Sequence, residues 1–122
     1  MNKRGFTLIE VLIGLVILAI GLLGIAGMQA SSVKGNFFSN NLTEATYIAK
    51  DRLELLKTLP FGDGALSVST RSDGTTPGSS GIAFNRTYTV TQDGTGFKTI
   101  TYQVAWNDGV ARAITFTTIR SQ

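Results

Sequence analysis

An uninterrupted apolar run dominates the first quarter of the chain. No charged residue occurs at positions 11–28, and Phe6, Leu8 and Ile9 extend the run toward the N-terminus. A helix needs about 20 mainly apolar residues to cross a bilayer, which this stretch provides. Because the run is apolar on every side, it suits lipid or a bundle of other helices. The pattern predicts a membrane-spanning helix, or a helix within a bundle, over residues 6–30.

Residues 31–60 carry a different pattern, because apolar side chains recur there at helical spacing with polar side chains between them. The recurring apolar positions are Leu42, Ala45, Ala49, Leu53 and Leu56, flanked by Ile48 and Leu59. Pro60 ends the pattern, since the residue before a proline is disfavoured in the α conformation. We therefore predict one long helix over residues 6–60, whose amphipathic half, 31–60, packs on a globular body.

The middle of this predicted helix is weak. Gly35 and several serines and asparagines lie within residues 31–41. These residue types are poor helix formers in isolation. The sequence predicts a bend or fraying there, with a straight helix stabilised by neighbouring segments as the alternative.

Residues 61–122 predict a small body rich in β-structure. Gly, Ser, Thr and Asp predominate at 61–81, which indicates an exposed connection with one short strand at 66–70. Apolar and polar residues then alternate, as in half-buried strands; the apolar positions are Phe84, Tyr88, Val90, Ile100, Tyr102, Val104, Trp106, Ile114 and Phe116. Turns are predicted at 93–96 and 107–109, because Asp-Gly supplies the positive φ angles of tight hairpins. The predicted fold class is α+β, a long N-terminal helix packed on a small three- to four-stranded antiparallel sheet.

Composition removes several kinds of chemistry. The chain has no Cys and no His, so disulfides, thiolate nucleophiles, the usual zinc ligands and the commonest general base are excluded. Asp51 and Glu54 fall on the polar side of the helix, whereas Asp73, Asp93 and Asp108 lie among glycines and are interpreted as turn formers. We therefore predict no enzyme, no cofactor and no metal site. The net charge of +3 is not concentrated on any run, so no direct nucleic-acid partner is predicted.

One ionisable side chain stands at the start of the apolar run, within Lys3-Arg4-Gly5-Phe6-Thr7-Leu8-Ile9-Glu10-Val11-Leu12. A charge at the bilayer centre costs about 2.5–3.5 kcal/mol on insertion scales, and less near an interface. A carboxylate at Glu10 therefore implies a partner. If the chain is cut after Gly5, Phe6 acquires an ammonium group, which Glu10 of a staggered neighbouring chain can neutralise. Such a pair sets the axial register of helices that pack side by side.

This segment resembles the prepilin cleavage and methylation signature of type IV pilins and type II secretion pseudopilins. The resemblance implies that residues 1–5 are a basic leader, which a membrane prepilin peptidase removes by cutting between Gly5 and Phe6. It further implies N-methylation of Phe6, a role for the Glu10 carboxylate in methylation and subunit docking, and a type IV pilin-like fold.

Partners and location are implied by the same resemblance. The implied partners are the prepilin peptidase/methyltransferase, other major and minor pilins, and an inner-membrane assembly platform. The chain is expected to cross the bacterial inner membrane once, with its C-terminal domain in the periplasm. After assembly it is expected in a pilus or pseudopilus.

A finer resemblance points to the minor pilin PilV group. It rests on Ile20-Gly21-Leu22-Leu23-Gly24 with Met28-Gln29, on residues 48–54 with Leu59-Pro60-Phe61, and on residues 106–109 with 112–115. The chain also lacks the paired cysteines that close the C-terminal loop of many major pilins. The implied function is structural, in pilus assembly, initiation or modification. A minor pseudopilin of a type II secretion system and a short major pilin are the alternatives.

The glycines of the apolar half allow two interpretations. Gly14, Gly21, Gly24 and Gly27 are small residues of the kind that let membrane helices approach closely, which predicts a role in helix packing. Glycine also costs up to about 1 kcal/mol relative to alanine in a helix. Local melting of residues 19–28 in a filament is therefore a second hypothesis.

Two other membrane-associated classes compete with the pilin-like interpretation. A secretory signal peptide shares the basic start, the apolar core and small residues such as Ala26 and Ala30, but its core carries no charge comparable to Glu10. A single-span protein without a filament role gives no reason for Glu10 or for the Gly5-Phe6 junction. A mature chain that begins at Phe6 supports the pilin-like class, whereas a start near Ser31 supports the signal peptide.

Overall fold

The computed structural model describes residues 5–122, so the predicted leader lies outside the described residues except for Gly5. The elements follow in the order α1, a short 3-10 helix and four strands. By compactness the chain divides into two units, Met1–Phe37 and Phe38–Gln122, and α1 contributes residues to both.

Helix α1 (Leu8–Thr58) confirms the predicted long N-terminal helix. It begins at Leu8 rather than Phe6, because Thr7 caps its first turn, and it ends at Thr58 ahead of Pro60. Every residue of the 31–41 segment is helical, so the predicted fraying is wrong. Gly35 costs only about 1 kcal/mol, and helix propagation from good helix formers on both sides offsets that cost.

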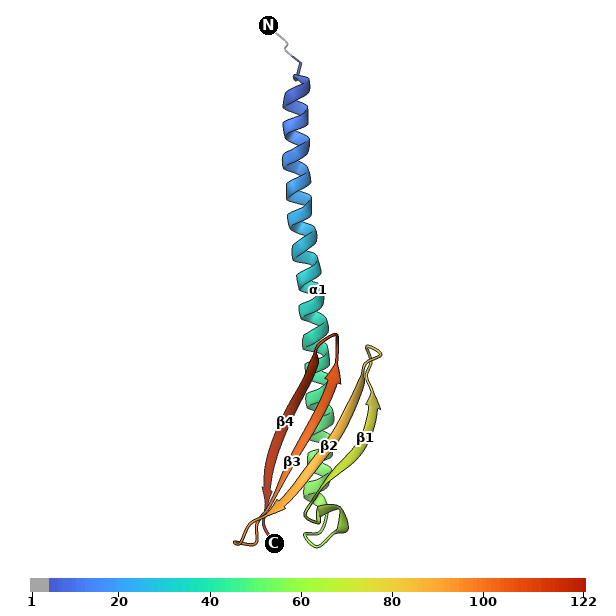
Figure 1. The fold of residues 1–122 in the computed structure, drawn as a ribbon, viewed down its shortest axis with the longest axis vertical. Helices are drawn as coiled ribbons and strands as arrows, with labels where there is room; N and C mark the ends of the chain where they lie inside the picture. The colour runs from blue at the N-terminus through green and yellow to red at the C-terminus, as the bar shows by residue number, and fades with distance from the viewer. Residues whose placement is uncertain (1–4) are drawn as a thin grey trace. The chain divides into compact units, whose positions relative to one another are not determined.

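A four-stranded antiparallel sheet forms the body of the second unit (Figure 1). The strands are β1 (Ser69–Pro77), β2 (Ala83–Gln92), β3 (Lys98–Asn107) and β4 (Ala111–Arg120), and they lie side by side in that order. The predicted α+β class is therefore confirmed, and the last three strands correspond to the three alternating runs of the sequence.

Strand β1 is longer than the sequence indicated. The predicted short strand at 66–70 is wrong, because Gly64–Leu66 form a 3-10 helix and β1 extends from Ser69 to Pro77. A register shift between Ser72 and Gly74 interrupts its pairing with β2. Pairing with a strand of strong β propensity thus recruits a Gly-, Ser- and Thr-rich segment that has little preference of its own.

The turns between the last strands are where the sequence placed them. Asp93 accepts a hydrogen bond from the amide of Thr95 at 3.0 Å, and Gly96 takes a φ of 89°. In the next turn, Asn107 accepts from the amide of Gly109 at 2.9 Å, and Gly109 takes a φ of 103°. Glycine meets these positive angles without a clash, so the positions of both hairpins are confirmed. In the first turn the positive angle falls on Gly96 and not on Gly94 of the predicted Asp-Gly pair.

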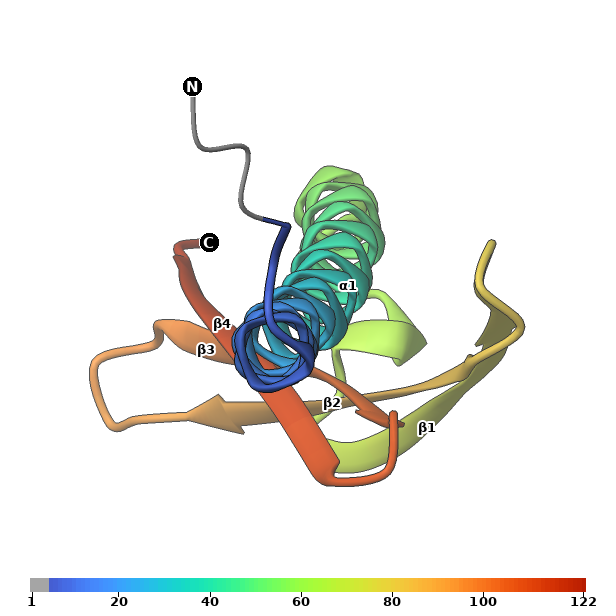
Figure 2. The same cartoon turned by 90° about the horizontal axis from the view of Figure 1, so that it is seen from above.

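The core of the second unit lies between α1 and one face of the sheet. Figure 2 shows residues 38–58 of α1 over that face and no other element across the opposite face. The buried apolar residues are Ala45, Ala49, Leu56, Leu66, Phe84, Tyr88, Val90, Ile100, Tyr102, Val104 and Trp106. Most of the predicted stripe is thus confirmed, with Leu42 and Leu53 partly buried against it. Asn41 is also fully buried and was not predicted; its side-chain oxygen accepts from the hydroxyl of Ser80 at 2.7 Å.

Candidate functional site

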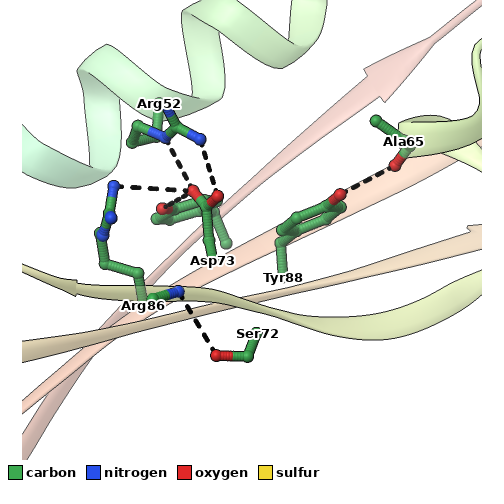
Figure 3. Close-up of polar contacts among 8 residues, drawn as sticks. Arg52, Ala65, Ser72, Asp73, Arg86 and Tyr88 are labelled. Carbon is green, nitrogen blue, oxygen red and sulfur yellow. Dashed lines mark hydrogen bonds and ion pairs between the residues drawn. The ribbon is translucent and has the colours of Figure 1, made fainter.

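An ionic cluster joins α1 to the sheet within the second unit. The carboxylate of Asp73 accepts two hydrogen bonds from the Arg52 guanidinium, both 2.7 Å long, and one from the Tyr102 hydroxyl at 2.6 Å. A guanidinium nitrogen of Arg86 lies 3.8 Å from the same carboxylate. Figure 3 shows Arg52 reaching from the helix to Asp73, with Arg86 on its other side. One carboxylate therefore collects side chains from α1, β2 and β3.

The surroundings of this carboxylate favour its charged form. Burial opposes ionisation, but the hydrogen bonds from Arg52 and Tyr102 outweigh it and hold the pKa of the Asp73 carboxyl below its usual value. Burial, together with the bond to Asp73, raises the pKa of the Tyr102 phenol, and the bond to Asp73 raises the pKa of the Arg52 guanidinium. Each group is held in the charge state that it has at neutral pH. The cluster therefore acts as a structural anchor and does not poise these groups for proton transfer.

The interpretation of Asp73 as a turn former is wrong. Asp73 lies in β1 at the register shift, and Gly74 after it takes a φ of 89°. A bulge of this kind bends a strand and re-aims a side chain. Asp73 thereby reaches Arg52, which is 21 residues away in sequence. By contrast, Asp93 and Asp108 lie at the hairpins as predicted, and Asp51 and Glu54 are exposed on α1.

A second set of contacts fixes the connection that follows α1. Lys98 is buried, and its ammonium donates to the carbonyl of Phe61 at 2.7 Å while lying 4.3 Å from the centre of the Phe61 ring. The hydroxyl of Tyr88 donates to the carbonyl of Ala65 at 3.0 Å. Arg120, which pairs across the ladder with Lys98, donates to the carbonyl of Lys57. These donors satisfy backbone acceptors at and beyond the end of the helix, where no intrahelical partner exists.

These contacts could not be predicted from the sequence, since each joins residues from separate elements. A metal site is not formed either: within residues 5–122, no three His, Cys, Asp or Glu side chains are grouped so that they could hold an ion.

The predicted assembly segment lies at the start of α1. The hydroxyl of Thr7 accepts a hydrogen bond from the amide of Glu10 at 3.2 Å, and the carbonyl of Thr7 accepts from the amide of Val11 at 3.2 Å. Thr7 is therefore the N-cap, and Glu10 is the third helical residue, the spacing of a capping box. A carboxylate in the first turn also interacts favourably with the helix dipole. This local role of Thr7 and Glu10 was missed, although Thr-x-x-Glu before an apolar run is its sequence signal.

The predicted cleavage site lies just ahead of the helix. Gly5 and Phe6 are outside regular secondary structure, and the Phe6 side chain is 82% exposed. The bond between them is therefore not held in helical hydrogen bonds. The expected pairing of Glu10 with the Phe6 terminus joins two different chains, so it stays a prediction.

The apolar half of α1 leaves its side chains uncovered by the rest of the chain. Every Leu, Ile, Val and Met side chain from Leu8 to Val33 is between 47% and 77% exposed. Among the described residues, α1 is the one helix long and apolar enough to cross a membrane, judged by length and composition. So large an apolar surface is unstable in water, which fits membrane anchoring of this half.

The first residues decide which proteins this chain resembles. Residues 1–26 match the family model of the prokaryotic N-terminal methylation motif. No curated protein and no solved structure matches the chain. The methylation motif supports a type IV pilin-like prepilin and implies processing by a prepilin peptidase and assembly with other pilins. The long helix on a four-stranded antiparallel sheet is an arrangement typical of pilins.

The methylation motif spans Gly5, Phe6 and Glu10, and three of the four glycines singled out above. Apart from its chain neighbours and the backbone of its own helix, a β-carbon added at Gly14, Gly21, Gly24 or Gly27 would meet nothing within 4 Å. Close packing at these glycines therefore requires another molecule and stays a prediction. The helix is continuous from Gly21 to Gly27 in the single chain, and melting in a filament stays a prediction as well.

Proposed function

We propose that this chain is a structural subunit of a type IV pilus-like filament, made as a prepilin that is cut between Gly5 and Phe6 and methylated on Phe6. The observation that carries the proposal is the match of residues 1–26 to the methylation motif, at the start of a helix whose apolar side chains face outward. Residues 1–5 would be the leader, 6–30 the membrane and filament-core segment, 31–60 the amphipathic half, and 61–122 the connection and sheet.

The geometry ahead of the helix suits proteolytic processing. A peptide bond inside a helix must be unwound before a protease can bind it, because its backbone groups are already hydrogen-bonded. The Gly5-Phe6 bond precedes the N-cap Thr7, so its cleavage leaves the capped first turn intact. The new ammonium on Phe6 then lies next to the helix start.

The proposed role of Glu10 in assembly follows from its carboxylate, which lacks a partner among residues 5–122. Thr7 already accepts the Glu10 amide, whereas no hydrogen bond or ion pair engages the Glu10 carboxylate within residues 5–122. A free carboxylate among lipid-facing side chains is costly. Neutralisation by the Phe6 ammonium of an adjacent subunit removes that cost and fixes the axial offset between two chains.

The finer assignment is a PilV-like minor pilin that acts in pilus assembly, initiation or modification. It would reside in the inner membrane with residues 61–122 in the periplasm, and it would meet the peptidase/methyltransferase, other pilins and the assembly platform. A minor pseudopilin of a type II secretion system is the second candidate, since the methylation motif serves both systems. Deletion that abolishes secretion but leaves pili intact would select the pseudopilin. Near-stoichiometric recovery in sheared pili would select a major pilin.

The mass of the mature N-terminus tests the proposal. The expected product begins at Phe6 and carries one added methyl group; a product that begins near Ser31 contradicts the proposal. Glu10→Gln then isolates the charge, because glutamine at this position retains the capping-box spacing. Glu10→Val removes both charge and capping ability.

The two variants separate assembly from local helix capping. Both are expected to insert in the membrane and to lose methylation or incorporation into filaments. Incorporation of Glu10→Gln at the wild-type level would remove the charge of Glu10 from the mechanism.

A further inference from the structure

The sheet distributes its charged residues in an unusual way. The charged residues of the four strands are Arg71, Asp73, Arg86, Lys98, Arg112 and Arg120. Asp73 and Arg86 belong to the ionic cluster on the helix side. Lys98 and Arg120 donate to backbone carbonyls at and beyond the end of α1. The guanidinium of Arg112 lies 4.2 Å from the centre of the Phe38 ring of α1. Arg71 is directly opposite the buried Tyr88, so it shares that face. Within the four strands, the outer face therefore carries no charged side chain.

Hydroxyl and methyl groups take the place of charges on the outer face. One row of paired residues across all four strands consists of threonines alone: Thr70, Thr89, Thr101 and Thr117. The hydroxyls of Thr70 and Thr89 are hydrogen-bonded to each other at 3.0 Å. On the same face, Thr75 donates to the side-chain oxygen of Asn85 at 2.9 Å. Because some hydroxyls already have partners within the face, covering it leaves fewer polar groups unsatisfied.

We propose that this outer face is a self-association surface, on which the sheets of two copies of the chain pack face to face. Two copies that packed through charged surfaces would suffer repulsion between like charges and would remove those charges from water, both at a cost in free energy. The uncharged face is the one on which that repulsion is weakest. It also lacks the Lys and Arg side chains that a nucleic acid or an anionic membrane would require.

The size of the face sets the expected strength. Four strands about 4.8 Å apart and about 33 Å long offer roughly 600 Å² per copy, or about 1,200 Å² for the pair. That total is at the lower end of specific interfaces. The face also has no aromatic or arginine side chain, the types that dominate tight interfaces. Association is therefore expected to be weak and to matter where chains are concentrated in one membrane.

The direction of the strands is compatible with anchoring in one membrane. A two-fold axis parallel to the strands, between the two outer faces and over the seam between β2 and β3, would bring the two sheets together. It gives residues 38–58 of the two α1 helices the same general direction, inclined to each other because the strands are inclined to α1 (Figure 1). Only the shared direction of the helices rests on the proposed membrane anchoring. The absence of charge and the area of the outer face are independent of it. This axis places β3 of one copy over β2 of the other. Gln103 then lies opposite Thr87 of the second copy, since these two residues are paired in the β2–β3 register.

Thiol cross-linking of the full chain in detergent micelles tests the proposal, because the natural chain has no cysteine. Gln103→Cys places an exposed thiol on the face; the two Cα atoms at position 103 would be about 11 Å apart, given a sheet separation of about 10 Å, and both thiols would point into the gap between the sheets, within reach of a short bis-maleimide. The control is Tyr47→Cys, on the side of α1 away from the sheet, where the side chain is 73% exposed. A cross-linked dimer is expected for Gln103→Cys, with about tenfold less for Tyr47→Cys.

A charge on the face is the second arm. Thr87→Lys in the Gln103→Cys background is expected to lower the dimer yield about tenfold, because it brings like charges together, whereas Tyr47→Lys is expected to leave the yield unchanged. Circular dichroism checks that each variant is folded, and Thr89→Lys replaces Thr87→Lys if the latter is not. Equal cross-linking at positions 103 and 47, or a yield insensitive to both lysines on the face, overturns the proposal and assigns any association to another surface. The N-terminal mass of the same sample reports the proposed processing separately.

Discussion

Arg52 and Asp73 meet through two hydrogen bonds of 2.7 Å, which tie the last turns of α1 to the bulge of β1. The bond is bidentate, the strongest geometry between a guanidinium and a carboxylate. β1 is an edge strand with little β propensity, and it pairs with β2 alone. Its attachment to the helix therefore depends heavily on this contact.

Loss of the Asp73 charge should destabilise the second unit. Asp73→Asn leaves Arg52 and Arg86 without their carboxylate, and we expect a cost of about 2–3 kcal/mol, below that of a fully buried pair because Arg52 is partly exposed. The urea midpoint of the β-sheet circular dichroism at pH 7 measures it. Asp51→Asn, on the exposed side of the same helix, should change the free energy of unfolding by less than about 0.5 kcal/mol. Equal midpoints for both variants would contradict the anchoring role.

The contribution of Asp73 should disappear in acid. Its folded-state pKa lies below the unfolded value of about 3.9, so the stabilisation is present above that pH and is lost as the pH falls through the folded-state pKa. The difference in unfolding midpoint between wild type and Asp73→Asn should be constant from pH 7 to 5 and should shrink below about pH 4. A difference that persists undiminished at pH 2 would exclude ionisation of Asp73 as its cause.

Lys98 should stabilise the connection after α1 rather than the whole sheet. Lys98→Met retains most of the side-chain volume but leaves the Phe61 carbonyl without its donor, at a cost of about 1–2 kcal/mol. Hydrogen exchange should accelerate at the amides of Asp63 and Leu66, which are hydrogen-bonded within this connection. Lys50→Met, an exposed site on α1, is the matched control and should leave both rates unchanged.

Thr7 should set the stability of the first turn of α1. Thr7→Val preserves the branched shape but removes the oxygen that accepts the Glu10 amide, and a lost N-cap costs about 1 kcal/mol. Exchange of the Glu10 amide in micelles should become about fivefold faster. Thr43→Val removes a hydroxyl that only bonds back to the Ser39 carbonyl within the helix, so its effect should be small. If Thr7→Val leaves the exchange rate unchanged, the cap does not operate in that environment.

Gly5 should be required by the processing enzyme and not by the fold. Among the described residues, an added β-carbon at Gly5 meets nothing within 4 Å beyond its chain neighbours, so we expect the fold to tolerate Gly5→Ala. We expect unprocessed prepilin to accumulate in the membrane, as measured by the mass of the N-terminal peptide. Gly14→Ala introduces the same methyl group at an equally open helical site and should be processed normally. Normal processing of Gly5→Ala would remove the leader assignment.

The assembly segment could be recognised from sequence because its signals are local. Lys3 to Leu12 carry the cleavage and methylation signature as consecutive residues, and the apolar run follows directly. The hairpins at Asp93 and Asp108 could also be predicted from sequence, since a tight turn is specified by the φ preferences of a few adjacent residues.

Contacts between distant segments could not be predicted in the same way. Asp73 looked like a turn residue because it precedes Gly74, and only the pairing of β1 with β2 converts that pair into a bulge. The buried Lys98 followed the alternation of its strand, but nothing near it in sequence identifies the Phe61 carbonyl as its acceptor.

Residue patterns were sufficient to predict the apolar helix, the processing motif, the α+β class and the position of the last three strands, because each depends on residue types within one short window. The tertiary structure alone decided the length of β1, the anchor of Asp73 on Arg52, and the exclusion of charge from the outer face of the sheet. These features depend on which strands pair, in which register and against which side of the helix. Pairing and register are set by burial of the whole apolar face together, and no single segment of the chain carries that information.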